Sequence, residues 1–236
     1  ATTVELEPLL EGADAVINYR LNGVWTEQLV EARSETSPCT NPGPVPLNIG
    51  FCTGLWPGLV FDGTRAILAY RDVHNGQFPQ QDWAGSYVKV AEGTPGAYTP
   101  VCQVPTNEGK LAYGGRISMV MGKDNLPAFT HEKTLGGADT PGSVVYFTRK
   151  LMNGTWSNEI TEKLVISNTM SGASLAYDPV EGFGLAALEH NEDKLYYAHD
   201  DDGLGSWPAA TAVIGAGSNG WYPSLAMDPV NHEPAI

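Results

Sequence analysis

The sequence has little positive charge, few cysteines and no long apolar run. Its 236 residues include 13 Lys and Arg against 27 Asp and Glu, which gives a formal net charge of −14. Because nucleic acid phosphates are bound by basic surfaces, this balance argues against nucleic acid as a partner and against anionic membranes. No apolar stretch approaches the length that spans a bilayer, so membrane insertion is not expected.

Cysteine is scarce, and its positions limit the possible disulfides. Three cysteines allow one disulfide within the chain, and Cys39 and Cys52 are the candidates because they flank a Pro- and Gly-rich loop. Cys102 is left over, and no spacing of Cys and His indicates zinc. Low Lys content, abundant Trp, Tyr, Asn and Gly, and the nominal glycosylation acceptor Asn153-Gly154-Thr155 favour an exported protein, extracellular or periplasmic.

Catalytic motifs are missing as well. The chain has no Gly-x-Ser-x-Gly elbow, no phosphate-binding glycine loop and no His-Glu-x-x-His. Carboxylate pairs suited to glycoside hydrolysis occur throughout, so they identify no site. Asp200-Asp201-Asp202-Gly203 suggests calcium, but consecutive Asp side chains in a strand point to opposite faces and no Glu follows at EF-hand spacing. We interpret this run as a turn and predict no catalytic residue, metal ligand or cofactor, with calcium as the weaker alternative.

What the chain does have is turn residues and an internal repeat. It contains 27 Gly and 17 Pro, and helical periodicity is nowhere convincing. The recurring Asp62, Asp178 and Asp228 are interpreted as turn formers that hydrogen-bond their own backbone. One apolar phrase occurs four times, each time followed by a polar turn and a second apolar strand, at residues 57–63, 117–122, 173–179 and 222–229.

A second recurring phrase predicts a hairpin in each unit. An aromatic strand leads through a turn to another aromatic residue, and Asn22-Gly23 and Asn153-Gly154 are strong hairpin signals because they supply positive φ angles. Each unit therefore has four strands, named A to D in chain order. The last unit stops after A and B, the first segment begins with C and D, and the register continues across the termini.

Four-stranded antiparallel units of about 59 residues predict an all-β protein, a β-propeller formed by one domain over residues 1–236. Pairing the terminal strands in one blade closes a four-bladed ring if the chain is complete, because it leaves no exposed edge. The alternatives are a fragment of a five- to seven-bladed propeller and a β-sandwich of several hairpins. The predicted blades are 46–106, 110–167, 168–217, and 219–236 joined with 1–34.

One hairpin carries a family resemblance. The run from His199 to Trp207, His-Asp-Asp-Asp-Gly-Leu-Gly-Ser-Trp, resembles a degenerate Asp-box, the Ser-x-Asp-x-Gly-x-Thr-Trp hairpin of sialidase-like β-propellers. The turns before Trp25 and Trp156 keep only the Gly and the Trp. In that family the box is structural, so the resemblance implies a propeller. Sialidase-like catalysis would need three converging arginines, and none in this chain lies in the Arg-Ile-Pro context of that family.

The first set of candidate ligand-binding residues lies just before strand A, in the D-to-A loops. Aligning the units places Trp56, Arg116, Gly172 and Tyr222 at one equivalent position, with Trp221 beside the last. These aromatics either cap the apolar space between blades or form a stacking platform for a sugar or another planar ligand, with Arg116 as a charged anchor.

The second set lies in the B-to-C loops, which are the most irregular part of each unit. These loops offer Trp83 and a His with a carboxylate nearby in each of three units: His74, His131 and His190. They are interpreted either as a ligand-binding rim, with metal binding as a further option if the imidazoles converge, or as solvated loop residues.

Together these observations favour a non-catalytic exported binding module, lectin-like and carbohydrate-binding or acting in cell-surface adhesion. Its partner would be a glycan or a protein surface. A glycoside hydrolase or lyase on a β-propeller is the first alternative. A structural component of a protein assembly, with its faces used in subunit contacts, is the second, and it would form an oligomer.

Overall fold

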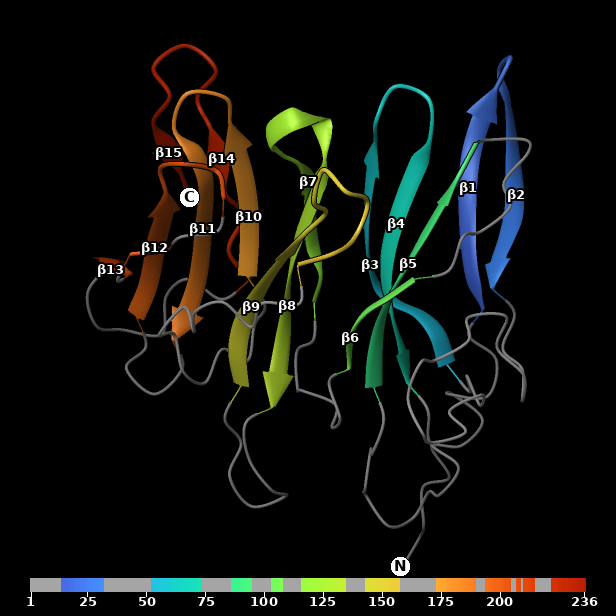
Figure 1. Cartoon of the computed structure of the whole chain (residues 1–236), viewed down its shortest axis with the longest axis horizontal. Helices are drawn as coiled ribbons and strands as arrows, with labels where there is room; N and C mark the ends of the chain where they lie inside the picture. Colours follow the sequence, from blue (N-terminus) through green and yellow to red (C-terminus); the bar gives the residue numbers. More distant parts are fainter. Residues whose placement is uncertain are drawn as a thin grey trace, which may run out of the picture. The chain divides into compact units, whose positions relative to one another are not determined.

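The computed structural model shows a chain built from β-strands (Figure 1). It describes residues 14–31, 52–73, 86–94, 103–107, 116–134, 143–157, 173–189, 194–204, 207–208, 210–214 and 222–236. Among these residues no helix is long and apolar enough to span a membrane. The chain divides into two compact parts. The N-terminal part is Ala1–Pro57 with Gly63–Leu111, and the C-terminal part is Gly58–Asp62 with Ala112–Ile236. The predicted all-β class is confirmed, and the strand pairs are antiparallel.

The N-terminal half of the chain contains two sheets. β1 (Ala15–Leu21) and β2 (Val24–Glu31) form a hairpin, and its turn residues Asn22 and Gly23 have φ angles of 50° and 85°. These positive angles are what a type I′ turn requires, as the Asn-Gly pair predicts. The second sheet is a four-stranded meander in chain order: β3 (Cys52–Phe61), β4 (Ala66–Val73), β5 (Ser86–Gly93) and β6 (Gln103–Asn107).

The hairpin β1–β2 packs one face against β4 and β5. Side chains of alternate residues in β1 turn inward, so Ala15 and Ile17 join a buried cluster while Val16 between them stays partly exposed. The cluster also contains Val30, Ala66, Leu68, Tyr70 and Ala91.

A buried ion pair reinforces this packing. The Glu31 carboxylate accepts a hydrogen bond from Lys89 Nζ at 2.8 Å and one from the Tyr70 hydroxyl at 2.6 Å. All three side chains are buried, and they come from β2, β5 and β4. The end of β2 is therefore fixed to the meander by a satisfied polar network as well as by apolar contact.

The C-terminal half contains three further sheets (Figure 1). The first is three-stranded in the described chain, with β7 (Ser118–Met121), β8 (Pro127–Thr134) and β9 (Ser143–Arg149), and a 3₁₀ turn at Lys123–Asn125. The second is a four-stranded meander of β10 (Ala173–Asp178), β11 (Gly182–Glu189), β12 (Lys194–Asp200) and β13 (Thr211–Ile214). The third is the short pair β14 (Ala226–Met227) and β15 (Pro234–Ala235).

The first strands of these three sheets are linked by the serine of the repeated phrase. The backbone N–H of Leu175 in β10 donates to Ser118 Oγ in β7 at 2.9 Å. The backbone N–H of Leu225 donates in the same way to Ser174 Oγ in β10, also at 2.9 Å. Each serine thus binds the backbone of the next unit, which explains why the phrase repeats Ser before an apolar residue.

The main core of the C-terminal part of the chain lies between its two larger sheets. Phe147 of β9 meets the rings of Phe183 and Trp207 edge-on, with centroid distances of 4.9 Å and 5.2 Å. The opposite face of the β10–β13 sheet carries a smaller cluster of Ala176, Ala186 and Leu225. Because both faces are covered, all eight residues of β11 are buried, and the strand reads as a nearly continuous apolar run.

The structure agrees with the predicted strand order inside the units. The two meanders follow the order A to D, whereas strand D predicted after β9 lies outside the described residues. β14–β15 and β1–β2 are separate two-stranded sheets, and no pairing between β15 and β1 is present among the described residues. The blade shared by the two termini, the closed ring and the single domain stay predictions.

Candidate functional site

Arg116 and Tyr222 are the two predicted ligand-binding residues that the structure brings together. The guanidinium carbon of Arg116 lies 4.3 Å from the centroid of the Tyr222 ring. Each residue precedes the first strand of its sheet, Arg116 before β7 and Tyr222 before β14. Arg116 is exposed, and 55% of Tyr222 is exposed. A cation over an aromatic face at this distance is favourable, so the pair holds both side chains in one surface feature.

The backbone at Tyr222 is unusual for a bulky residue. Its φ angle is 55°, and Trp56, the equivalent residue of another unit, has a φ of 47°. Both residues precede a proline, Pro57 and Pro223, which already restricts their conformation. Left-handed angles are rare for large side chains and concentrate at functional sites. The repeated conformation shows that the same local turn presents an aromatic side chain in two units.

Trp56 differs from its predicted place in one respect. The sequence places it just before strand A, whereas the structure places it inside β3, which begins at Cys52. Gly54 and Trp56 both have positive φ in this strand, so the strand is irregular where the repeat predicted a loop. Trp56 is partly buried, which leaves part of the ring accessible.

The remaining candidates are only partly visible in the structure. Trp83, Trp221, His74 and His190 lie outside the described residues, and so do Cys39 and Cys102 and the side chain of Cys52. Their predicted roles in ligand binding and in a disulfide stay predictions.

The rim location predicted for His131 is wrong. His131 lies in β8 rather than in a loop, and only 2% of it is exposed. Its ring stacks on Tyr146 at a centroid distance of 5.6 Å, and its Nε2 lies 3.4 Å from Thr148 Oγ1. His131 is therefore part of the sheet interior.

Arg71 and Glu189, which the sequence also places in B-to-C loops, lie in strands for the same reason as His131. The sequence ends strand B at the last apolar residue, but backbone pairing continues through the polar residues, with Arg71 opposite Val88 and Glu189 opposite Lys194. Both side chains are buried. Apolar patterning alone underestimates the length of a strand whose polar residues are buried and satisfied.

The turns between strands A and B confirm the turn-forming role of two aspartates. Asp178 Oδ1 accepts hydrogen bonds from the N–H groups of Val180 and Glu181, at 2.7 Å and 3.0 Å. Asp228 Oδ1 accepts the equivalent bonds from Val230 and Asn231, at 2.7 Å and 3.1 Å. Each carboxylate closes its own turn, as Asp-Pro sequences favour.

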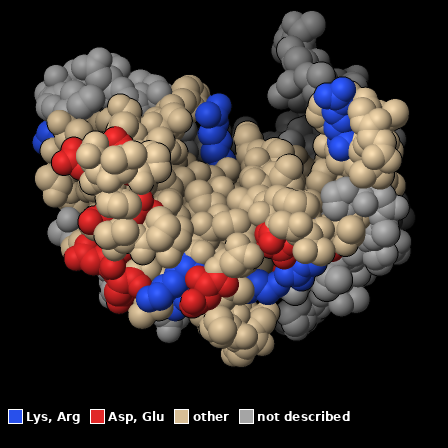
Figure 2. All heavy atoms as spheres, turned by 90° about the horizontal axis from the view of Figure 1, so that it is seen from above, with Lys and Arg blue, Asp and Glu red and all other residues tan. Residues whose placement is uncertain are grey.

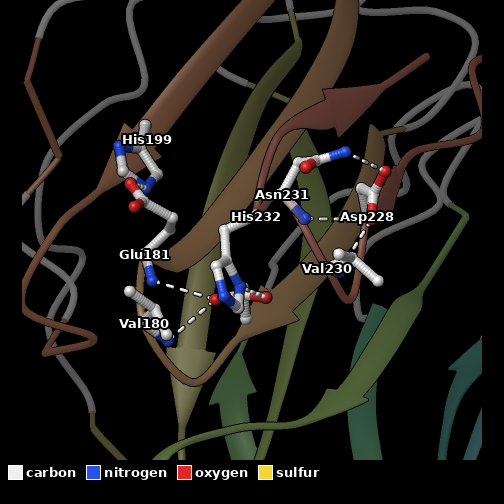
Figure 3. Close-up of polar contacts among 8 residues, drawn as sticks. Val180, Glu181, His199, Asp228, Val230, Asn231 and His232 are labelled. Carbon is white, nitrogen blue, oxygen red and sulfur yellow. Dashed lines mark hydrogen bonds and ion pairs between the residues drawn. The ribbon is translucent and has the colours of Figure 1, made fainter.

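His232 joins these two turns, a contact that sequence reasoning missed (Figure 3). Its Nδ1 lies 2.9 Å from Asp178 Oδ2, so the imidazole of the last turn reaches the carboxylate of the preceding one. The φ angle of His232 is 63°, and Gly182, four residues after Asp178, has a φ of 88°. A His in the place of a repeat glycine was the available signal.

Further acidic groups surround this contact. His199 Nδ1 lies 2.8 Å from Asp201 Oδ1, and its Nε2 lies 3.8 Å from Glu181 Oε2. Seen from above, Asp and Glu side chains gather at the left of the molecule, over the C-terminal strands (Figure 2). Among the described residues, no group of three or more His, Cys, Asp or Glu side chains is arranged to hold a metal ion.

The contact between Asp178 and His232 shifts both titrations. The His232 hydrogen bond holds the pKa of Asp178 below its ordinary 3.8, helped by the N–H groups of Glu181 and Val180 and opposed by burial. The Asp178 hydrogen bond raises the pKa of His232 above 6.5, again against burial, and the carboxylates of Glu181 and Asp228 add to the rise.

These directions predict a pH window for the stability of the C-terminal turns. The His232 contribution is complete below pH 6.5 and is lost as the pH rises through its raised pKa. The Asp178 contribution is complete above pH 3.8 and is lost as the pH falls through its lowered pKa. We expect His232→Gln to lower the urea unfolding midpoint most between these limits and least in alkaline solution. A difference that does not change with pH, or one that persists in the Asp178→Asn background, would contradict this.

Comparisons with known proteins give little for this chain. No family model matches it, and no curated protein matches it. Among solved structures, the chain is similar to a GH43_1 enzyme from Xanthomonas citri, with 12% identity, a TM-score of 0.46, and coverage of 96% of this chain and 72% of that one. A likeness this low carries no conclusion about what this chain binds or catalyses.

Proposed function

We propose that this chain is an exported β-propeller that binds carbohydrate without catalysis, through the residues that precede the first strand of each blade. The propeller is supported by the way the C-terminal sheets follow one another. Successive first strands β7, β10 and β14 are joined through Ser118 and Ser174, and the apolar core lies between successive sheets. Blades that stack face to face around their first strands have this arrangement.

The contact between Arg116 and Tyr222 carries the functional part of the proposal. Tyr222 presents a large exposed ring held by a left-handed backbone, and Arg116 lies over it at 4.3 Å. An aromatic ring offers an apolar face against which the C–H face of a sugar can pack, with little side-chain entropy to lose. The guanidinium fork can donate paired hydrogen bonds to neighbouring hydroxyls or to a sugar carboxylate.

The net charge of the chain favours a neutral sugar or a sugar with one carboxylate, rather than a polyanion, as the ligand of Arg116 and Tyr222. The chain carries a formal net charge of −14, so a densely charged anion is repelled at long range. A single arginine beside an aromatic ring supplies local attraction for one carboxylate or for hydroxyls. Trp56 offers the same kind of aromatic side chain in the N-terminal part of the chain.

A glycan array followed by calorimetric titration of the best ligand tests the proposal. We expect Tyr222→Ala and Arg116→Ala each to weaken binding by roughly tenfold or more, because truncating an anchoring aromatic or Arg side chain costs about 2 kcal/mol or more and tenfold corresponds to about 1.4 kcal/mol. Met152→Ala is the matched control, since Met152 is an exposed apolar residue of the same C-terminal part of the chain and lies in a different turn.

The outcomes separate the three functions considered. Binding that survives both substitutions, or no glycan ligand at all, overturns the proposal. Release of sugar products from the bound glycan supports the glycoside hydrolase or lyase alternative instead, and product analysis after prolonged incubation detects it. A protein that binds no glycan and only assembles with itself supports the structural alternative.

A further inference from the structure

Tyr222 is carried by a short segment that has little support of its own. It precedes β14 and β15, which contain two residues each, and Ala226, Pro234 and Ala235 of these strands are exposed. A two-stranded pair is only marginally stable in water unless it packs on other elements. The position of Tyr222 therefore depends on how β14 and β15 are attached to the β10–β13 sheet.

The first attachment lies close to Tyr222. The N–H of Leu225 donates to Ser174 Oγ near the start of β10, at 2.9 Å. The Leu225 side chain is buried in one cluster with Ala176 and Ala186. This attachment restrains the chain three residues after Tyr222, and a second contact further along is needed to set the direction of the segment.

The second attachment is the contact between His232 and Asp178 (Figure 3). His232 Nδ1 lies 2.9 Å from Asp178 Oδ2, and Asp178 is the last residue of β10. Ser174 and Asp178 are separated by roughly 13 Å of extended strand, at about 3.3 Å per residue. The β14–β15 segment is therefore attached near both ends of β10, and two separated attachments fix its direction as well as one point.

The imidazole of His232 is not needed to form its own turn. The backbone N–H of His232 donates to the Asp228 carbonyl oxygen at 2.9 Å. The Asp228 carboxylate accepts from the N–H groups of Val230 and Asn231 and from the Asn231 side chain. These bonds close the turn without the imidazole. The imidazole contact therefore serves to attach the turn to β10.

The side chains around His232 make this attachment depend on pH. They are Asp178 and Glu181 of the β10–β11 turn, Asp228 of its own turn, and, next to Glu181, His199 and Asp201 at the end of β12. Carboxylates dominate this group, so they favour the protonated imidazole. Because the pKa of His232 is raised, its contribution is complete below pH 6.5 and is lost as the pH rises through that raised pKa.

We propose that His232 is a positioning residue for the ligand-binding pair of Arg116 and Tyr222. Ligand binding weakens as the pH rises, because the contact between His232 and Asp178 is lost. The segment then stays attached at Leu225 and pivots there, and Tyr222 moves relative to Arg116, which precedes β7. The effect on ligand binding rests on the proposed function, whereas the effect on the contact between Arg116 and Tyr222 does not.

Nuclear magnetic resonance of the ligand-free chain tests the structural step without any glycan. Protons above an aromatic face are shielded by its ring current, so the Arg116 side-chain protons report the contact with Tyr222. Tyr222→Leu identifies these signals, because it abolishes the ring-current shift. In the parent chain we expect this shift to decrease from about pH 6 to about pH 9, as an imidazole in acidic surroundings loses its proton.

Three variants assign the pH response to His232. His232→Gln does not titrate, so it is expected to show at every pH the smaller ring-current shift that the parent shows in alkaline solution. His232→Lys stays charged to about pH 9 and is expected to keep the larger shift throughout. His199→Gln is the matched control, because His199 pairs with Asp201 rather than with the β14–β15 turn, and it should leave the response unchanged.

Calorimetric titration with the neutral glycan that binds most tightly on the array tests the functional step. A neutral glycan does not titrate, so a change in affinity with pH belongs to the protein. We expect the affinity of the parent to fall about fivefold from acid to alkaline solution, at the low end of the usual coupling between two sites. The affinity of His232→Gln should not depend on pH.

The two measurements fail in different ways. A ring-current shift that is constant with pH, or a pH response that persists in His232→Gln, overturns the positioning role of His232 whether or not a glycan binds. A shift that responds as expected while glycan affinity stays constant overturns the effect on binding. A chain that binds no glycan overturns the proposed function and the effect on binding with it, and the magnetic resonance measurement still decides the structural step.

Discussion

Replacing Glu31 with Ala is expected to destabilise the N-terminal sheets by about 3–5 kcal/mol, because it leaves the buried Lys89 ammonium without its carboxylate. Glu31 and Lys89 are joined at 2.8 Å, and the Tyr70 hydroxyl loses its 2.6 Å acceptor as well. Breaking a buried ion pair by removing one partner costs far more than an exposed ion pair contributes. The effect should therefore exceed that of a surface substitution several-fold.

The double variant Glu31→Leu with Lys89→Met separates the cost of breaking the pair from the value of the pair. Replacing both partners with apolar side chains of similar size is often neutral, so we expect the double variant to be more stable than Glu31→Ala. Hydrogen exchange of peptides from β4 and β5 in increasing urea measures the local free energy of unfolding. A single variant that costs less than about 1 kcal/mol would show that the pair is solvated.

Trp207→Ala is expected to lower the free energy of unfolding of the C-terminal part of the chain by about 3–5 kcal/mol, the range for truncating a large buried aromatic side chain. The ring is 6% exposed and contacts Phe147, so its removal opens a cavity between two sheets. Its indole N–H donates no hydrogen bond within the described part of the chain. Trp207→Phe keeps most of the apolar contact and breaks no such bond, so it should cost less than half as much.

Trp25→Ala is the matched control for this prediction. It removes the same side chain from the equivalent place, but 68% of Trp25 is exposed. Its effect on the free energy of unfolding should stay within about 0.5 kcal/mol. Equal losses for Trp25→Ala and Trp207→Ala would contradict the difference in burial between the two hairpins.

The parts of the fold that depend on local chemistry could be predicted from the sequence. The Asn22-Gly23 turn and the Asp178 and Asp228 turns form as their residues require, because the turn is made by those residues alone. The strand order of the two meanders also follows from the repeat. Four similar phrases, each followed by a turn, leave few other ways to pair.

The parts that depend on contacts between strands could not be predicted. The role of Ser118 and Ser174 as acceptors for the next strand is invisible until the strands are placed side by side. The interior position of His131 depends on Tyr146 and Thr148, which are distant in sequence and supply the stacking and the polar contact that a buried imidazole needs.

The candidate site shows the same division. Alignment of the repeats was enough to select Arg116 and Tyr222 as equivalent residues. Their contact could not be inferred, since it joins side chains more than a hundred residues apart in the chain. The left-handed backbone of Trp56 and Tyr222 could not be inferred either, because a residue before proline normally adopts an extended conformation.

A crystal structure of the chain with the glycan selected by the array is the most direct test of the central claim. We predict a sugar ring packed on Tyr222 and hydrogen-bonded to the Arg116 guanidinium, beside first strands β7, β10 and β14 that are joined through Ser118 and Ser174. A glycan bound away from Arg116 and Tyr222, or first strands that are not neighbours, would contradict it.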